Sequence, residues 1–304
     1  MPNWQEVLEE ILKVQKEGHP SPINLVRKKY LSQLSGYTKR NVIAYYSGFL
    51  SSAFAGGIEI SEDDKNGFML CCHGLDQARG LDLILHTGGG DPYAMDSLVS
   101  YLRGIFGDDI RAIVPQIAMS AGTMMAVACK SVVMGKQSCL GPTDPQMNGF
   151  PAYAIKRQFE RACAEITLNP RVAPAWQPIL GQINVSFLEQ CNLVMEYAED
   201  FVTRALRENM LKNDTDANAK AVEIAKKLSD LGENKSHSRR FHYADCKDMG
   251  LTIEILEEDQ KLQDLVLTIH HCYMHGMGNV VKVIENHEGR AWGKQPPPTL
   301  RAPA

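Results

Sequence analysis

Hydrophobic residues along the chain follow two spacings, and the way these alternate predicts a mixed α/β protein. Short runs rich in β-branched residues predict strands at 41–47, 81–85, 110–114, 131–134, 138–140 and 251–256. Apolar residues at helical spacing predict helices at 4–14, 24–34, 60–75, 92–106, 122–128, 152–166, 183–211, 214–231, 243–249 and 259–274. Where one long helix separates two strands, as at 81–114, the crossover favours strands that run parallel.

The same pattern divides the chain into three parts. Residues 1–38 hold two helices before the first strand, so we expect an N-terminal helical arm used for packing or assembly. Residues 39–275 carry all the predicted strands and are expected to form the main domain. Residues 276–304 are polar and rich in proline, so we expect a tail that is mobile at its end.

The composition indicates an ordinary soluble globular protein without affinity for nucleic acid or membranes. Hydrophobic residues make up 44% and charged residues 22% of the chain, and a net charge of −4 gives no attraction to polyanions. No apolar run is long enough to span a bilayer, and the start of the chain lacks the pattern of a signal peptide. We therefore expect a cytoplasmic protein whose eight cysteines are buried free thiols rather than metal ligands or disulfides.

The candidate chemistry lies in one stretch, residues 81–146. Its first predicted strand ends in Gly88, Gly89 and Gly90, whose backbone N–H groups can approach an anion because no Cβ blocks them. The phosphate-binding patterns GxGxxG and GxxxxGK[ST] are absent, which disfavours a nucleotide site. The alternative is a tight strand-to-helix turn that binds nothing.

Ser120 stands where the next strand segment ends and a short helix begins. The helix dipole at such a position favours negative charge. An oxyanion formed by attack of Ser120 on a carbonyl group is therefore expected to bind the N–H of Ala121 and a glycine N–H of the 88–90 turn. The alternative is a serine that only caps the helix.

A nucleophilic serine needs a base, and Lys156 is the first candidate. It follows the largely apolar residues 152–155, and desolvation by such neighbours lowers the pKa of a lysine towards the range of a general base. The alternative is a solvated helix lysine. The rival bases are the histidines at 73, 86, 242, 270 and 271, and His237, which we retain as a reserve base or orienter. No GxSxG motif surrounds Ser120, which argues against an α/β-hydrolase triad.

Five fragments in a fixed order carry a family resemblance: LILHTGGG, AMSAGT, GPTDPQ, HSRRFHYADCKDMGL and LQDLVLTIHH. Together they resemble the serine dehydrogenase proteinase family, which has the ClpP/crotonase fold and is related to signal peptide peptidase A. The resemblance covers roughly residues 40–275. It implies an α/β fold with a parallel sheet built from ββα units, to which this chain adds the N-terminal helical arm and C-terminal helices.

The resemblance also implies an activity. It implies a serine peptidase with Ser120 as the nucleophile and an oxyanion hole formed by Gly89 or Gly90 together with Ala121. Signal peptide peptidase A and its relatives use a Ser–Lys dyad, for which Lys156 is the best positional match. In ClpP a histidine follows the serine, whereas the corresponding region of this chain holds only the turn with Thr143 and Asp144. We expect a peptide or protein substrate, no cofactor or metal, and a homo-oligomer.

Two other functions stay open at this point. The missing ClpP-type histidine would fit a catalytically weak or inactive member of the fold that binds peptides or serves as a scaffold. A crotonase-type acyl-CoA hydratase or hydrolase shares the oxyanion hole of two amides. The second is less favoured, because no adenine site is visible in the sequence.

Overall fold

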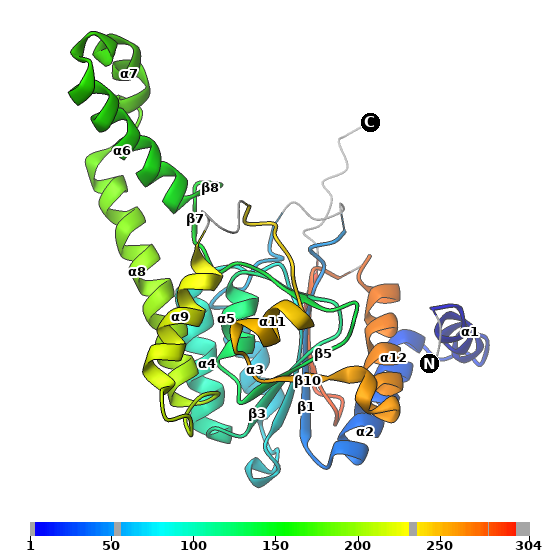
Figure 1. Ribbon diagram of the computed structural model, residues 1–304. Helices are drawn as coiled ribbons and strands as arrows, with labels where there is room; N and C mark the ends of the chain where they lie inside the picture. The colour runs from blue at the N-terminus through cyan, green and yellow to red at the C-terminus, as the bar shows by residue number, and fades with distance from the viewer. Residues whose placement is uncertain (1–3, 52–55, 231–235, 279, 296–304) are drawn as a thin grey trace, which may run out of the picture.

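A seven-stranded sheet forms the centre of the protein, as seen in a computed structural model that describes residues 4–51, 56–230, 236–278 and 280–295 (Figure 1). Its strand order is β10-β5-β3-β2-β1-β11-β12. The strands are β1 (Asn41–Ser47), β2 (Leu81–His86), β3 (Ile110–Val114), β5 (Ser131–Met134), β10 (Ile253–Ile255), β11 (Lys282–Asn286) and β12 (Ala291–Lys294). The first five run parallel, β11 is antiparallel to β1, and β12 is antiparallel to β11.

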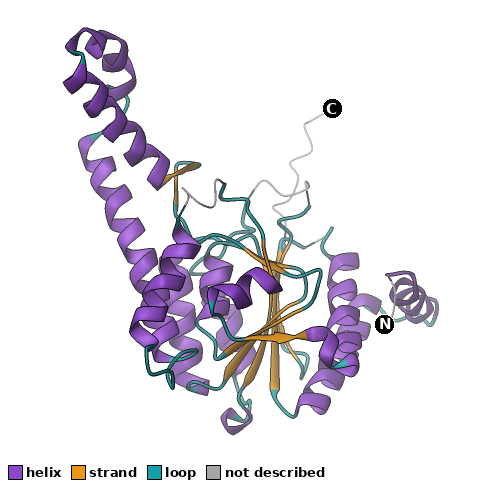
Figure 2. Ribbon diagram, in the orientation of Figure 1, coloured by secondary structure: helices purple, strands orange, loops and turns teal. Residues whose placement is uncertain are grey.

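Helices cover both faces of this sheet (Figure 2). On one face lie α2 (Pro22–Thr38) and α12 (Gln260–Gly276), with α1 (Trp4–Lys16) packed outside them. The other face is covered by α3 (Asp64–Cys72), α4 (Pro92–Phe106), α5 (Ala121–Val127), α9 (Ala217–Ser229), part of α8 (Val185–Glu208) and α11 (Tyr243–Met249). The arrangement is a three-layer α/β fold.

A helical extension projects from the body next to the sheet (Figure 1). It is built from α6 (Ala152–Leu168), α7 (Ala173–Leu180) and the start of α8. The remaining short elements are the strands β4 (Ile117–Ala118), β6 (Cys139–Leu140), β7 (Gln146–Met147), β8 (Phe150–Pro151) and β9 (Phe241–His242) and the 3₁₀ turns η1 (Gln77–Arg79), η2 (Pro170–Val172) and η3 (Leu256–Glu258). Strands β4, β6 and β9 form a small second sheet.

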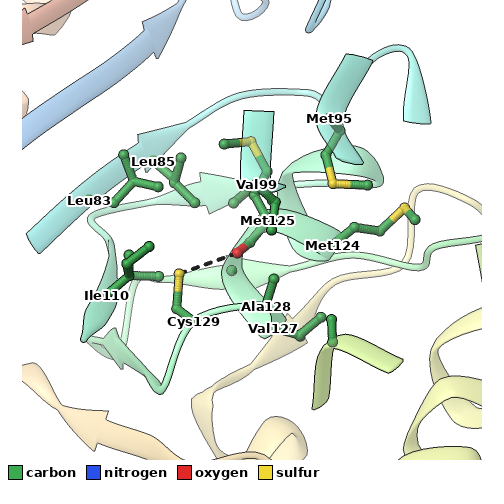
Figure 3. Packing of buried hydrophobic residues seen from close by; sticks show 14 of the residues in the cluster. Leu83, Leu85, Met95, Val99, Ile110, Met124, Met125, Val127, Ala128 and Cys129 are labelled. Atoms are coloured by element: carbon green, nitrogen blue, oxygen red, sulfur yellow. Dashed lines mark hydrogen bonds between the residues drawn. The ribbon is translucent and has the colours of Figure 1, made fainter. Parts of the chain in front are cut away.

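The larger hydrophobic core lies between the sheet and α4, α5 and α8 (Figure 3). Alternate residues of a strand point to opposite faces, so Leu83 and Leu85 of β2 meet Met124 and Met125 of α5 on this side. Every residue of α5 is buried. The helix that begins at Ser120 is therefore held firmly on the sheet.

On the opposite face, aromatic and histidine side chains pack beneath α12. His86 is fully buried, and its ring lies 5.2 Å from those of Tyr46 and His270. Burial lowers the pKa of His86 and that of His270 to about 3, because a charged imidazole would lose its hydration there. Both side chains are consequently neutral in the folded protein at pH 7.

These two histidines predict acid-sensitive stability. In the unfolded chain they take up protons near pH 6.5, whereas the folded protein excludes them down to about pH 3. The unfolded state thus binds more protons in this window, and each histidine lowers the free energy of unfolding by about 1.4 kcal/mol per pH unit as the pH falls. Denaturant unfolding of His86→Leu between pH 6.5 and pH 5 should give a shallower slope than the unaltered protein; equal slopes would contradict this.

Many predicted elements are confirmed. The strands at 41–47, 110–114 and 131–134 and the helices at 92–106 and 243–249 have the predicted bounds. The helix predicted at 24–34 is longer, since α2 continues through Gly36 to Thr38. Leu31 and Leu34 of α2 pack against the sheet, so this helix belongs to the main core rather than to a separate arm. All eight cysteines are free and seven are buried, with Cys163 exposed.

The prediction that residues 276–304 form a polar tail is wrong for the part that the structure describes. Strand β11 lies within the sheet between β1 and β12, and all five of its residues are buried. Its charged side chains are neutralised internally, since Lys282 pairs with Asp64 and Glu285 with Arg27. These charges made a buried strand resemble a polar tail. Residues 296–304, including the prolines, lie outside the described part of the chain.

Candidate active site

The two strand ends of the 81–146 stretch meet in the folded protein. Both backbone polar groups of Thr87 bond to the segment 117–119. The Thr87 N–H donates to Ile117 O at 3.1 Å, and the Thr87 carbonyl accepts from Met119 N at 3.0 Å. Gly89 then passes so close to Ser120 that a Cβ on it would lie 2.7 Å from Ser120 Cβ. The glycine turn and the serine therefore form one site.

Ser120 has a strained backbone. Its φ of 52° and ψ of −119° belong to a turn conformation that normally selects glycine. Its side chain makes no capping hydrogen bond to α5, so Ser120 is not an ordinary N-cap serine. A strained turn from strand to helix is also how α/β-hydrolases present a nucleophilic serine, although that fold is unrelated.

Two backbone N–H groups at this site are available to a ligand. Those of Gly90 and Ala121 make no hydrogen bond within the described residues, whereas Gly89 N–H donates to Thr87 Oγ1 at 3.1 Å. Ile60 pairs with Gly89 O and Asp91 N at 2.9 and 3.0 Å. Successive backbone groups of an extended segment point to opposite edges, so the N–H of Gly90 points to the edge away from Ile60. Of the two glycines predicted for the oxyanion hole, Gly90 has the free N–H group.

A cavity of about 460 Å³ opens over Ser120. Its walls include the glycine turn and Ala121, and its apolar side chains include Phe49, Ile58, Met124, Met147, Val194 and Ala198. Among its polar lining residues are Thr143 and His237. Ser120 and a histidine thus face the same space.

His237 is oriented by a buried carboxylate. Its Nδ1 lies 2.9 Å from Asp144 Oδ1, and the Asp144 side chain is only 3% exposed. Gln146 Nε2 donates to the other oxygen of Asp144 at 3.0 Å. When Nδ1 carries the proton it donates to Asp144, which leaves Nε2 as a proton acceptor. No hydrogen bond joins Ser120 to His237 in this structure, and catalytic hydrogen bonds in unliganded enzymes are often long.

Lys156 lies elsewhere. It is on α6 and lines a second cavity of about 490 Å³, together with Glu196, Glu199 and Lys226. Asp144 and Pro145 also line this second cavity, so it adjoins the cavity over Ser120. It is not among the residues that line the cavity over Ser120. The structure therefore places five of the predicted site residues around one cavity, Ser120, Gly89, Gly90, Ala121 and His237, but not Lys156.

Asp144 is the residue that the sequence analysis did not select. Its signal was present in the Gly141–Pro145 turn, where a carboxylate stands between Thr143 and Pro145. Such a carboxylate is buried at a cost unless it has a hydrogen-bonding partner. A histidine N–H is one such partner. No group of three or more His, Cys, Asp or Glu side chains among the described residues is placed to hold a metal ion.

Comparison with known proteins identifies the family. The sequence profile of the ClpP-like SDH-type serine proteinases matches residues 25–283. The chain belongs to this family. The predicted resemblance and the predicted ClpP-like α/β fold are thereby confirmed, and the family supports a peptidase function.

Relatives with similar sequences carry no assigned function. The uncharacterised protein MJ0137 of Methanocaldococcus jannaschii is 27% identical over 80% of this chain and 79% of its own length. A second uncharacterised protein of that organism, MJ1495, is 28% identical over 57% of this chain and 51% of its own length. Among solved structures, a mutant of the 1510-N membrane-bound stomatin-specific protease matches at 14% identity with a TM-score of 0.39, over 68% of this chain and 79% of that one. Within the described residues, no helix of this protein is both long and apolar enough to cross a membrane.

Proposed function

We propose that this ClpP-like proteinase cleaves peptide bonds with a Ser120–His237–Asp144 triad. The observation that carries the proposal is the shared cavity, which is lined both by Ser120 and by a histidine whose Nδ1 is bonded to a buried carboxylate. The chain order Ser–Asp–His is that of the α/β-hydrolases, which use the same three groups on another fold.

Each group has a defined step. His237 Nε2 takes the proton from Ser120 Oγ as this oxygen attacks the peptide carbonyl carbon. The N–H groups of Gly90 and Ala121 donate to the oxyanion of the tetrahedral intermediate. His237 then gives the proton to the leaving amine, and water hydrolyses the acyl-enzyme by the same path. Asp144 keeps the proton on Nδ1 and stabilises the imidazolium ion.

The cavity suits an extended peptide with apolar side chains. Ile60 occupies one edge of the glycine turn, so a peptide would add to the other edge, where Gly90 presents its polar groups. The aliphatic, Met and Phe side chains of the walls favour apolar substrate side chains over charged ones.

The Ser120–Lys156 dyad of a peptidase like signal peptide peptidase A is the alternative mechanism. It would require Lys156 to leave the second cavity and reach Ser120. A peptide-binding protein without activity is a second candidate function. The missing Ser120–His237 hydrogen bond favours it, because a triad that never closes would not activate the serine. A cytoplasmic location stays a prediction.

We also propose a homo-oligomer, in which the helical extension contacts a second copy. The extension carries exposed apolar side chains, among them Leu168 at 86% exposure and Ile179 at 44%. Apolar groups that gather on a projecting element are typical of protein interfaces. Light scattering should give a mass above the 33.8 kDa of one chain, and a monomer at micromolar concentration would contradict the proposal.

The function is tested by labelling with a fluorophosphonate probe. The probe reacts with an activated serine and should modify the purified protein at Ser120, as located by mass spectrometry of the peptides. Labelling of another residue would rule Ser120 out. Peptide binding without labelling would favour the inactive peptide-binding protein.

Gly89→Ala is expected to damage the site. With φ at +104°, the new Cβ would lie 2.8 Å from Met119 O and 2.7 Å from Ser120 Cβ, so Ser120 or the turn must move. A displacement near 1 Å lowers kcat/KM by about 10²-fold. Gly88→Ala is the matched control, because its Cβ would meet only the Phe49 side chain, at 3.1 Å. Hydrolysis of a fluorogenic peptide compares them, and equal rates would contradict the prediction.

A further inference from the structure

We propose that Lys282 is a positioning residue that holds the oxyanion turn in place through the backbone of residues 59–61. The proposal rests on the proposed function, because it concerns the Gly90 N–H of the same site. Lys282 lies on β11, is fully buried, and is not among the residues that line the cavity over Ser120. It therefore acts through the segment that it contacts rather than on the substrate.

The Lys282 ammonium group is enclosed and fully bonded. Its side chain is completely buried, and Nζ donates to Glu59 O and Asp64 Oδ1, each at 2.6 Å, and more weakly to Ser61 Oγ at 3.4 Å. Asp64 in turn accepts from Tyr45 OH and from Ser61 N, both at 3.0 Å. One buried ion pair thus fixes the backbone on both sides of Ile60.

Ile60 transmits this constraint to the glycine turn. Its N–H donates to Gly89 O at 2.9 Å, and its carbonyl accepts from Asp91 N at 3.0 Å, so Gly90 lies between the two bonds. The contact is close, since a Cβ on Gly90 would lie 2.2 Å from Ile60 N. The position of Ile60 therefore sets the direction of the Gly90 N–H group.

A buried ion pair is by itself poor support for a functional role, because its removal destabilises most proteins. A second pair in the same sheet supplies the control. Asp82, near the start of β2, is fully buried and accepts from Arg40 and Arg111 at 2.7 and 2.9 Å. It stands about 20 Å along the strand from the glycine turn, given about 3.3 Å per residue. Its loss should affect stability without affecting the turn.

The experiment compares Lys282→Met with Asp82→Asn under conditions in which both are folded, as judged by thermal unfolding. The first measurement is hydrogen–deuterium exchange of peptides covering 58–64 and 88–95. Lys282→Met should speed exchange in both segments by at least about tenfold, because the Ile60 and Asp91 N–H groups lose their fixed partners. Asp82→Asn should leave exchange there unchanged. If Lys282→Met does not fold, the double variant with Asp64→Asn removes the unpaired buried charge and takes its place.

The second measurement is peptide hydrolysis. Lys282→Met should lower kcat by about tenfold or more with KM changed by less than about threefold, because the oxyanion is bound only during the reaction. Exchange equal to that of the unaltered protein, or a kcat equal to that of Asp82→Asn, would overturn the proposal. If the unaltered protein neither reacts with the probe nor cleaves peptides, the proposed function fails, while the exchange data still decide whether Lys282 holds the turn.

Discussion

Replacing Ser120 with alanine is expected to reduce peptide hydrolysis by about 10⁴- to 10⁶-fold and to abolish fluorophosphonate labelling. The substitution removes the oxygen atom that attacks the substrate in the proposed mechanism. It leaves the fold intact, since the Ser120 hydroxyl makes no capping bond and the residue borders a fully buried helix. Steady-state hydrolysis of a fluorogenic peptide measures the loss. A variant that retains more than about a tenth of the activity would remove Ser120 from the mechanism.

Ser120→Gly, compared with Ser120→Ala, tests whether the backbone of Ser120 is strained. It should be as inactive as Ser120→Ala, but more stable than the unaltered protein by roughly 1 kcal/mol or more, because glycine adopts a φ of 52° and a ψ of −119° without strain. Denaturant unfolding of the two variants checks this. A glycine variant no more stable than the alanine variant would mean that the turn stores no strain.

The second large effect separates the two candidate bases. His237→Ala should lower kcat by about 10³-fold or more, and Asp144→Asn by up to about 10⁴-fold, since the amide no longer holds the reactive tautomer of His237. Lys156→Ala should change kcat by less than about threefold, because Lys156 lines another cavity. Peptide hydrolysis at saturating substrate measures all three variants.

The opposite pattern of losses would support the Ser120–Lys156 dyad as the mechanism. A large loss in Lys156→Ala with a near-normal His237→Ala would assign the base to Lys156 and require the α6 region to rearrange. Circular dichroism and thermal unfolding of each variant serve as the control for folding. Small losses in all three would leave Ser120 without a base and favour the peptide-binding alternative.

Local structure followed from the sequence to a large extent. The bounds of β1, β3 and α4 were predicted correctly because β-branched runs and apolar residues at helical spacing reflect interactions between residues a few positions apart. The glycines and Ser120 were predicted for the same reason, because an available N–H group and a serine at a helix start depend on adjacent residues. Ser120 and the glycine turn come from neighbouring parallel strands, so their meeting also followed from the order of elements.

Contacts between distant segments were decided only by the tertiary structure. Asp144 and His237 are 93 residues apart, and neither has a local feature that names the other as its partner. Lys156 was favoured by its apolar neighbours in sequence, yet near the start of α6 it lines a neighbouring cavity and not the one over Ser120. Lys282 belongs to the stretch that the sequence predicts to be a polar tail, whereas the structure places it on β11 inside the sheet.

The physical reason is that some features depend on residues close together in the chain and others on residues far apart. Helical or strand spacing, caps and turns are set by residues a few positions apart, so the sequence by itself determined the elements, the family and half of the site. The pairing of a buried charge depends on long-range packing that excludes water, and the pairing of Asp144 with His237 is of this kind. That pairing was made only when the whole chain folded around the sheet.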